Sequence, residues 1–389
     1  MLRTRHGKCR ILFGHDAQTC TECWRCKAKC AFPRRTEVGL HEIVDSCIHL
    51  DISYRRGASR MTSPAAAVGI IDPFHPRIIE GIRDALPKDW RMVVASEPTE
   101  EARAVALAEA DVAFVMATKM PRTLLSQAGK LRFIQKLGAG IDSIDVDYCR
   151  EAGIALARLQ AGNAIPVAEH TLLLMLAVCR NLPRLDAQTR AGRWDKEAVR
   201  GENQHLNGKT VGIVGFGAIG RQVARLLSGF SVNILYFDPV RAAPEDEAAL
   251  GSTYASLDDL VVASDVVKLH LPLVPATAGL ISAERLARMP RGAILVNAAR
   301  GGLIDEAALV EALREGRLFG AGLDAFSIEP PVGNPLLQMP NTVVTPHCAG
   351  ATLDNFASIA ARAVANAQSF LRGEALPAAD VVLAAPAKE

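Results

Sequence analysis

Short apolar runs alternate with helical patterns along the first part of the chain. Residues 67–73, 110–117 and 130–138 are apolar runs of strand length, which are typical of buried strands. Between them, residues 77–86 and 100–110 place apolar side chains at helical spacing. Because alternating strands and helices of this kind favour a parallel sheet, we expect an α/β lobe here.

A second alternating series follows a long apolar helix in which Pro166 suits the first turn. The strand candidates of this series are residues 210–214, 232–239, 265–273, 293–301, 320–326 and 341–347. Six strands at this spacing predict a doubly wound sheet. The final helical pattern, residues 351–373, has no strand series after it, so we expect it to pack back on the first lobe. The predicted fold class is therefore α/β, with two Rossmann-like lobes of doubly wound parallel sheets and a first lobe that is discontinuous in sequence.

Length and composition are those of a globular protein with two cores, since single cores rarely exceed about 250 to 300 residues and this chain has 389. The longest apolar run, residues 171–179, is too short to cross a bilayer, which takes about 20 residues. The chain also begins without a signal-peptide pattern.

Lys and Arg number 12 against 6 Asp and Glu in residues 1–60, but 32 against 36 in the rest. We therefore expect a cytoplasmic protein with no membrane and no nucleic-acid partner.

A glycine-rich loop directly follows the strand at 210–214. Gly215, Gly217 and Gly220 form the pattern G-x-G-x-x-G before a helical pattern, where they permit a tight turn, a close approach to a pyrophosphate and close helix packing. Asp238 ends the next strand and suits the ribose hydroxyls of NAD. Arg241, three residues on, leaves the preference for NAD over NADP open.

Three polar side chains follow apolar strands of the second series, at the sheet edge where open α/β sheets bind ligands. Arg300 has the planar donor fork that binds a carboxylate and polarises a keto oxygen. His347 has a side chain whose ordinary pKa, about 6.5, suits proton transfer near neutral pH. Glu329 is positioned to stabilise the imidazolium. This set is the minimum for reducing a 2-keto acid.

With these motifs the sequence resembles the D-isomer-specific 2-hydroxyacid dehydrogenases over about residues 66–377. The matching segments are GFGAIG with Asp238, HLPLVPAT, VNAARGGLIDE, GLDAFSIEPP and TPHCAG. The resemblance implies that Arg300, Glu329 and His347 are catalytic and that Ala139, Gly140 and Arg300 bind the substrate. The cofactor contacts it implies are Gly215, Gly217, Ala218, Ile219, Gly220, Asp238, Leu271, Ala298, Ala299, Arg300, Asp324, His347 and Gly350. Asp324 would lie near the nicotinamide carboxamide, with a plain turn residue as the alternative.

The resemblance implies an NAD-dependent oxidoreductase that transfers a hydride between NAD(H) and a small D-2-hydroxy acid or 2-keto acid, such as hydroxypyruvate or glyoxylate. It assigns residues 61–162 and 349–389 to a substrate-binding domain and 163–348 to an NAD-binding domain. We expect a homodimer and no metal in these parts. Formate dehydrogenases of similar fold have glutamine where Glu329 stands, which disfavours that branch.

Two alternatives stay open. D-3-phosphoglycerate dehydrogenases tend to carry an arginine where this chain has Val115 and Met116, although Lys119 or Arg122 could replace it. The second alternative is an NAD-sensing, corepressor-like interaction protein of the same fold. A turnover assay separates it from an enzyme.

Residues 1–60 differ in kind from the rest and contain CTECWRCKAKCAFP, with cysteines at 20, 23, 26 and 30. This spacing matches a ferredoxin cluster run, except that the proline comes late, and zinc suits the same thiolates. Three interpretations apply: a start site placed too far upstream, a disordered arm, or a true metal module. We favour the first, because the hydride chemistry of the body needs no one-electron centre.

Overall fold

The computed structural model describes residues 65–385. The chain divides into two units, Met1–Thr62 and Ser63–Glu389, and the described residues belong to the second. The cysteine run at 20–30 lies outside them, so its interpretations remain predictions.

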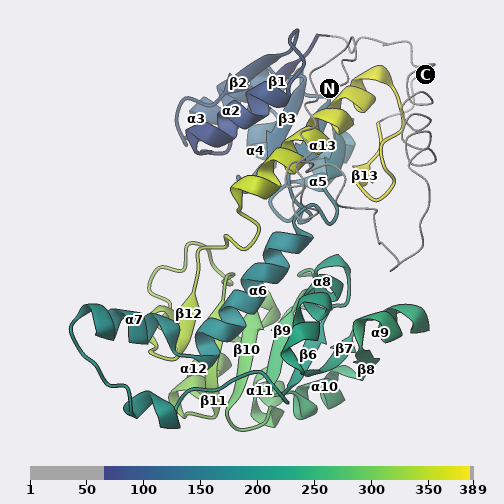
Figure 1. The fold of residues 1–389 in the computed structure, drawn as a ribbon. Coiled ribbons are helices and arrows are strands. Elements are labelled where there is room, and N and C mark those ends of the chain that lie inside the picture. Colours follow the sequence, from purple (N-terminus) through teal and green to yellow (C-terminus); the bar gives the residue numbers. More distant parts are fainter. Residues whose placement is uncertain (1–64, 386–389) are drawn as a thin grey trace, which may run out of the picture. The chain divides into compact units, whose positions relative to one another are not determined.

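The first lobe is built on a six-stranded sheet in the order β13-β5-β4-β3-β1-β2 (Figure 1). Its strands are β1 Ala67–Ile70, β2 Arg91–Val94, β3 Val112–Val115, β4 Phe133–Lys136, β5 Ala155–Arg158 and β13 Val381–Leu383. Strands β1 to β5 pair in parallel, whereas β13 pairs antiparallel with β5. The predicted parallel sheet is therefore confirmed for β1 to β5, and β13 adds an antiparallel edge strand, because it arrives from the final helix rather than by a strand-helix-strand crossover.

Helices of the first lobe come from both ends of the described chain. They are α2 Pro76–Ala85, α3 Glu100–Ala108, α4 Arg122–Leu125, α5 Val146–Glu151 and the last helix, α13 Leu353–Arg372. One core joins Phe356 and Ile359 of α13 to Val68 and Phe133 of the sheet. The rings of Phe133 and Phe370 stack with centroids 4.6 Å apart. The expected return of the chain to the first lobe is confirmed.

The second lobe is built on a seven-stranded, wholly parallel sheet in the order β12-β11-β10-β9-β6-β7-β8. Its strands are β6 Thr210–Val214, β7 Asn233–Phe237, β8 Ser252–Tyr254, β9 Val266–Leu269, β10 Ala293–Asn297, β11 Leu318–Leu323 and β12 Thr342–Val344. All six predicted strands are present. The sequence pattern missed only β8, which is a short edge strand with little apolar character.

Helices cover both faces of this sheet (Figure 1). One core contains residues of α6 Ala164–Cys179 and α8 Ala218–Leu227, and the other contains residues of α10 Leu257–Ala263, α11 Ala283–Arg288 and α12 Glu306–Arg314. The remaining helices are α7 Leu182–Arg190 and α9 Pro244–Leu250, with single 3-10 turns at Ala198–Gly201, Ser228–Phe230, Gly301–Leu303 and Pro335–Gln338. Among residues 65–385 no single helix is long and apolar enough to span a membrane; α6 and α7 pass together by length and composition, but are bent by 63°.

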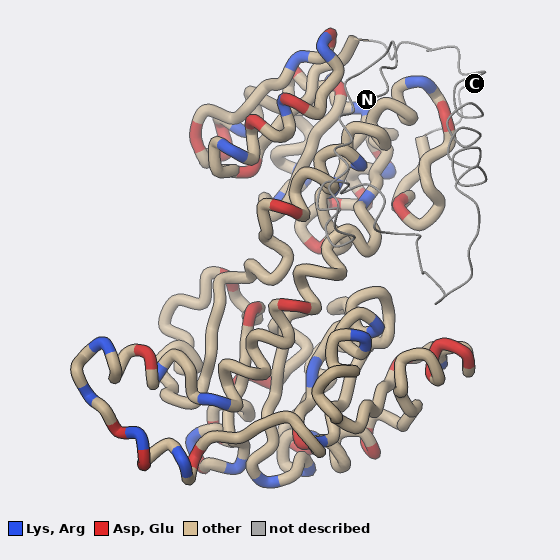
Figure 2. Tube along the Cα trace, viewed as in Figure 1, with Lys and Arg blue, Asp and Glu red and all other residues tan. Residues whose placement is uncertain are grey.

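Charged residues of both signs are interspersed along the described chain (Figure 2), but one lysine lies inside the second lobe. Lys268 of β9 is fully buried, and its Nζ has no hydrogen-bond partner among the described residues. Burial holds the pKa of Lys268 well below its usual range. The ring nitrogens of His270, two residues on, are also buried without partners. Burial and the nearby Lys268 lower the pKa of His270 as well.

Candidate active site

The glycine-rich loop joins β6 to α8 in the geometry that a dinucleotide requires. Gly215 has a φ of 98°, and a Cβ there would lie 2.7 Å from the His270 carbonyl. A Cβ on Gly220 would lie 2.1 Å from the Gly215 carbonyl oxygen, whereas one on Gly217 would meet no atom within 4 Å. The loop is thus closed on its inner side and open at Gly217, where α8 begins without a side-chain cap. Open space beside free helix N–H groups fits a pyrophosphate.

Asp238 lies directly after β7 and faces this loop. Its carboxylate accepts hydrogen bonds from the Phe216 N–H at 2.7 Å and the Val240 N–H at 3.1 Å. The guanidinium of Arg241 is paired with the Glu247 carboxylate through two hydrogen bonds of 2.8 and 3.0 Å. This pairing lowers the pKa of Glu247 to about 2. The guanidinium of Arg241, which had left a preference for NADP open, is therefore already paired with Glu247.

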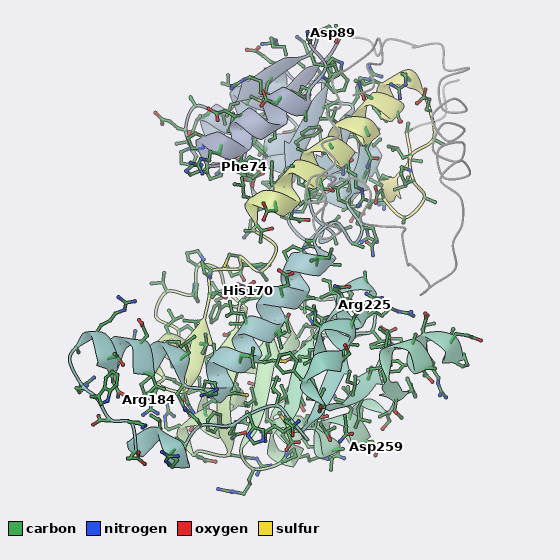
Figure 3. The ribbon with its side chains drawn as sticks, in the orientation of Figure 1. Phe74, Asp89, His170, Arg184, Arg225 and Asp259 are labelled. Atoms are coloured by element: carbon green, nitrogen blue, oxygen red, sulfur yellow. The ribbon has the colours of Figure 1, made fainter. Side chains whose placement is uncertain are left out.

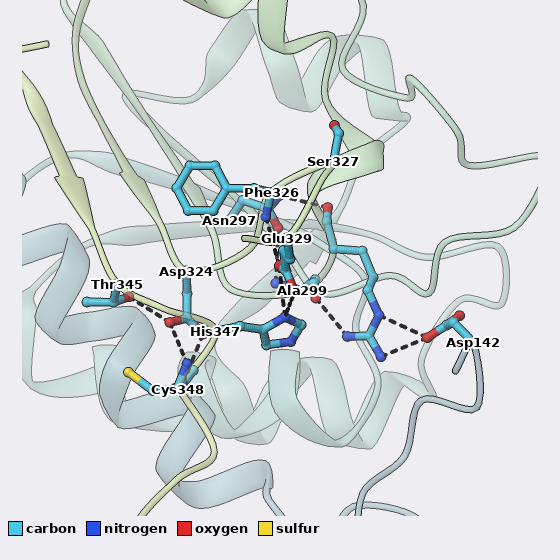
Figure 4. A network of polar contacts seen from close by, with 12 residues as sticks. Asp142, Asn297, Ala299, Asp324, Phe326, Ser327, Glu329, Thr345, His347 and Cys348 are labelled. Carbon is cyan, nitrogen blue, oxygen red and sulfur yellow. Dashed lines mark hydrogen bonds and ion pairs between the residues drawn. The ribbon is translucent and has the colours of Figure 1, made fainter. Parts of the chain in front are cut away.

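A histidine and a glutamate form a close pair at the carboxyl edge of the second sheet (Figure 4). Nδ1 of His347 lies 2.9 Å from both carboxylate oxygens of Glu329. The Phe326 N–H donates to Glu329 Oε1 at 3.0 Å, which fixes the carboxylate. His347 itself has a φ of 52°, in the left-handed region. The carboxylate on Nδ1 selects the tautomer that leaves Nε2 for proton exchange.

Arg300 follows β10 and contacts the loop after β4. Its Nε and Nη2 each lie 3.1 Å from Asp142 Oδ2, and its Nη1 donates to the Ala299 carbonyl at 2.8 Å. The Asn297 side chain holds this turn by donating to the Arg300 carbonyl at 2.8 Å and accepting from the Ala299 N–H at 3.0 Å. A Cβ on Gly140 would lie 1.8 Å from Arg300 Nη2, so any larger residue there would force the guanidinium to move.

Asp324, directly after β11, is fully buried. Its carboxylate accepts hydrogen bonds from the Thr345 hydroxyl at 2.6 Å and from the Cys348 and Ala349 N–H groups at 2.9 Å. The residues that donate these bonds stand on both sides of His347 in the sequence. Asp324 therefore fixes the loop that carries the histidine.

The other predicted cofactor residues line the same edge. Leu271 follows β9, Ala298 and Ala299 follow β10, and Gly350 lies against Asn163, since a Cβ on it would be 3.1 Å from Asn163 Nδ2. Ala139 lies beside Gly140 in the loop after β4. Arg122 lies apart from this set, paired with both oxygens of Glu151 at 2.8 Å.

Sequence reasoning missed several residues that hold the site together. Asp142 and Asn297 stand inside the GAGID and VNAARGG segments. The sequence motifs therefore indicated the segments that contain them, but not the contacts that they make. Thr345 likewise stands in TPHCAG. His170 of α6, whose Nε2 lies 3.0 Å from the Thr345 hydroxyl, carried no signal.

The second sheet, its open glycine loop and the polar edge define a Rossmann-type dinucleotide-binding protein. A family model described as D-isomer specific 2-hydroxyacid dehydrogenase, NAD binding domain, matches residues 172–349. The chain is 40% identical over 250 residues to hydroxypyruvate reductase of Thermotoga maritima, covering 63% of this chain and 80% of that one. The chain belongs to the D-isomer specific 2-hydroxyacid dehydrogenase family, and its second lobe contains the NAD-binding domain.

Other relatives differ in length and name. D-3-phosphoglycerate dehydrogenase of Methanocaldococcus jannaschii is 38% identical over 307 residues, which cover 78% of this chain and 57% of that one. The chain thus spans little more than half the length of this curated relative. The solved NAD-dependent formate dehydrogenase of Staphylococcus aureus in complex with NAD matches with a TM-score of 0.72 at 27% identity, covering 82% of this chain and 99% of that one.

Proposed function

We propose that the chain catalyses the NAD-dependent interconversion of a small 2-keto acid and the corresponding D-2-hydroxy acid. The observation that carries the proposal is the His347–Glu329 pair, with both carboxylate oxygens 2.9 Å from Nδ1. Nε2 has no hydrogen-bond partner among residues 65–385. Such a pair is suited to giving a proton to a carbonyl oxygen and taking it back from the alcohol.

In this proposal residues 163–348 hold the cofactor. The open space at Gly217 and the N-terminus of α8 would take the pyrophosphate, and Asp238 the ribose hydroxyls. Bound NADH supplies the hydride for the keto carbon. NAD is favoured over NADP because Asp238 would repel a ribose phosphate and Arg241 is held by Glu247.

His347 donates the proton from Nε2 as the keto oxygen becomes an alcohol. The imidazolium form that precedes this step is stabilised by the Glu329 carboxylate on Nδ1. In the oxidising direction the same Nε2 accepts the proton from the hydroxyl. Glu329 thus acts through His347 and touches no substrate atom.

Arg300 binds the substrate carboxylate and polarises the keto oxygen through its donor fork. Part of that fork is occupied by Asp142, so substrate would replace this contact. N–H groups of Ala139 and Gly140, in the segments assigned to the substrate-binding domain (61–162 and 349–389), would take the same carboxylate.

We propose that the keto acid is hydroxypyruvate or glyoxylate rather than phosphohydroxypyruvate, the keto acid that corresponds to phosphoglycerate. Val115 is fully buried in β3, where an arginine would be needed for a phosphate. Of the two possible substitutes, Arg122 is paired with Glu151, whereas Lys119 is exposed in the segment after β3. The comparison of phosphohydroxypyruvate with hydroxypyruvate as substrates therefore tests this choice.

The test is NADH oxidation with hydroxypyruvate, glyoxylate, pyruvate and phosphohydroxypyruvate. His347→Ala should lower kcat by about 10²- to 10⁴-fold, while His205→Ala, at an exposed position, should not change it. Glu329→Gln should lower kcat, because the imidazolium loses its counter-charge. NAD binding without turnover on any of these acids would instead support the corepressor-like alternative.

We also propose that the protein is a homodimer and that it is located in the cytoplasm. The α7 segment has no buried residue, and Leu182 and Trp194 are 52% and 79% exposed, which supports an interface there. Cys149, Cys179 and Cys348 are free thiols, which supports a reducing compartment. Analytical ultracentrifugation of the wild type and Trp194→Asp tests the first assignment, and cell fractionation tests the second.

A further inference from the structure

The loop that carries Glu329 makes few bonds to the rest of the protein. It comprises residues 326–334, and its members from 327 to 330 are all exposed. Within the described residues, and apart from bonds to the 3-10 turn that directly follows it, this loop is hydrogen-bonded to two side chains, those of His347 and Glu306. The contacts of Glu306 therefore bear on where the Glu329 carboxylate lies.

The loop that carries His347 is held from the interior of the second lobe instead. Asp324, which is fully buried, accepts hydrogen bonds from the Thr345 hydroxyl and from two N–H groups that follow His347. His170 of α6, labelled in Figure 3, lies with its Nε2 3.0 Å from the same hydroxyl. The histidine thus has a buried support, whereas Glu329 stands on an exposed loop.

A single carboxylate bonds this exposed loop on both sides of Glu329. Oε1 of Glu306 accepts from the Ser327 N–H at 2.6 Å and from the Ser327 hydroxyl at 2.9 Å, and Oε2 accepts from the Asn334 side-chain amide at 2.8 Å. Hydrogen bonds to a carboxylate are shorter and stronger than those to a neutral acceptor. The Ser327 N–H directly follows the Phe326 N–H, which donates to Glu329 Oε1 at 3.0 Å (Figure 4). Glu306 therefore fixes the backbone beside the donor that orients Glu329.

The helix that supports Glu306 is itself fixed. Glu306 is the first residue of α12, where the Asp305 carboxylate caps the helix by accepting from the Ala308 N–H at 3.0 Å. One side of the helix is buried in the core of the second lobe. The backbone at Gly301, just before the helix, lies directly against the loop, since a Cβ there would be 1.9 Å from the Phe326 carbonyl carbon. Glu306 can therefore hold the loop in one position.

We propose that Glu306 is a positioning residue for the keto-acid reaction, because it holds the loop of Glu329 where the Glu329 carboxylate meets Nδ1 of His347. The inference rests on the proposed function, since it concerns the same His347–Glu329 pair. Glu306 gives and takes no proton and acts through Glu329. Without its bonds the exposed loop gains conformational freedom, and the carboxylate spends less time beside the imidazole.

The first test is steady-state reduction of a keto acid by variants of α12. Glu306→Ala should lower kcat by about 10- to 100-fold, since a misplacement of about 1 Å can cost about 100-fold. KM for NADH should stay at the wild-type value, because Asp238 and the glycine loop keep their contacts. Glu306→Gln keeps one acceptor oxygen and should have a kcat between those of the alanine variant and the wild type. Glu311→Ala is the matched control, because it removes a carboxylate of the same helix that is paired at the surface with Arg314, and it should leave kcat unchanged.

A double-mutant cycle separates positioning from a general loss of structure. Removing the Glu329 side chain leaves no carboxylate to position, so Glu306→Ala should cause little further loss of kcat in a Glu329→Ala background. A structural defect alone would lower kcat by the same factor in both backgrounds, and that result would overturn the inference. A wild-type kcat in Glu306→Ala would overturn it as well.

Hydrogen–deuterium exchange tests the loop without turnover. In Glu306→Ala the Ser327 amide loses its acceptor, so a peptide covering residues 326–335 should lose protection, whereas Glu311→Ala should keep it. NAD binding by each variant verifies folding, and Glu306→Gln takes the place of the alanine variant if that variant does not fold. Unchanged exchange in this peptide would overturn the inference. A wild type that turns over none of the four keto acids would overturn the proposed function, and the exchange result would still decide whether Glu306 holds the loop.

Discussion

The buried lysine of β9 gives the sharpest test of how this fold is stabilised. Lys268 is paired through the backbone with Ile213 and Val296 of the neighbouring strands. Its strand also carries Val266, two residues away on the same face, which lies in the core under α6 and α8. We predict that Lys268→Met, which keeps the length and most of the volume of the side chain, stabilises the protein at neutral pH.

The size of the effect depends on pH in a defined direction. Burial holds the pKa of Lys268 well below the value of about 10.4 expected for the unfolded chain. At pH values between the folded-state and unfolded-state pKa of Lys268, the unfolded chain binds one proton more than the folded chain. The free energy of unfolding of the wild type therefore rises by about 1.4 kcal/mol per pH unit in this range. The advantage of Lys268→Met is therefore largest at low pH and should shrink by about 2 to 3 kcal/mol from pH 8 to pH 10. His270 stays neutral over this range, since its own pKa is lowered as well.

The assay is urea unfolding followed by circular dichroism at about pH 8 and about pH 10. Lys136→Met is the matched control, because this buried lysine donates to the Met116 carbonyl and to the Ser143 hydroxyl, the latter at 3.1 Å. Removing it leaves those acceptors unpaired and should destabilise the protein. The reasoning fails if Lys268→Met is no more stable than wild type at the lower pH, or if its advantage is the same at both.

Three further predictions concern the site and the thiols. Asp142→Asn frees the donor fork of Arg300, and because such half-exposed pairs are worth about 0.5 to 1 kcal/mol, KM for the keto acid should fall about two- to fivefold; steady-state kinetics showing an unchanged or higher KM would contradict this. Gly220→Ala places a Cβ 2.1 Å from a backbone oxygen, so NAD binding measured by calorimetry should be lost; retention of wild-type affinity would show that the helix can shift. Burial raises the pKa of Cys149 and of Cys179 to about 11, so both should resist alkylation in the native protein at pH 8 and react after denaturation; mass spectrometry of native, alkylated protein would reveal the opposite.

Much of the second lobe could be predicted because its signals are local. Strand, glycine loop and helix follow one another within residues 210–227, and each glycine has a steric reason that the sequence spacing already implies. The segments containing Arg300, Glu329 and His347 follow parallel strands, whose carboxyl ends must share one edge. Chain order alone therefore brings these three residues to one side of the sheet.

Contacts between distant segments could not be predicted in this way. The pairing of Arg300 with Asp142 spans 158 residues, and the bond between His170 and Thr345 spans 175. Neither has a periodic signal, because each depends on how separate elements pack. Strands β2, β5, β8 and β13 were missed for a different reason. RMVV, STY and VVL are short and partly exposed, so they lack the apolar run that marks a buried strand, and ALAR is a short segment of mostly small residues that ends in a charge.

The antiparallel strand β13 has a consequence for synthesis. The first lobe begins at β1, but its sheet gains its last strand only when residues 381–383 are made, and Asp380 must be present to pair with Arg362 and to accept from the Gln160 N–H. The second lobe, from α6 to β12, is synthesised before then. The lobe whose synthesis starts first is therefore the last to receive all of its strands.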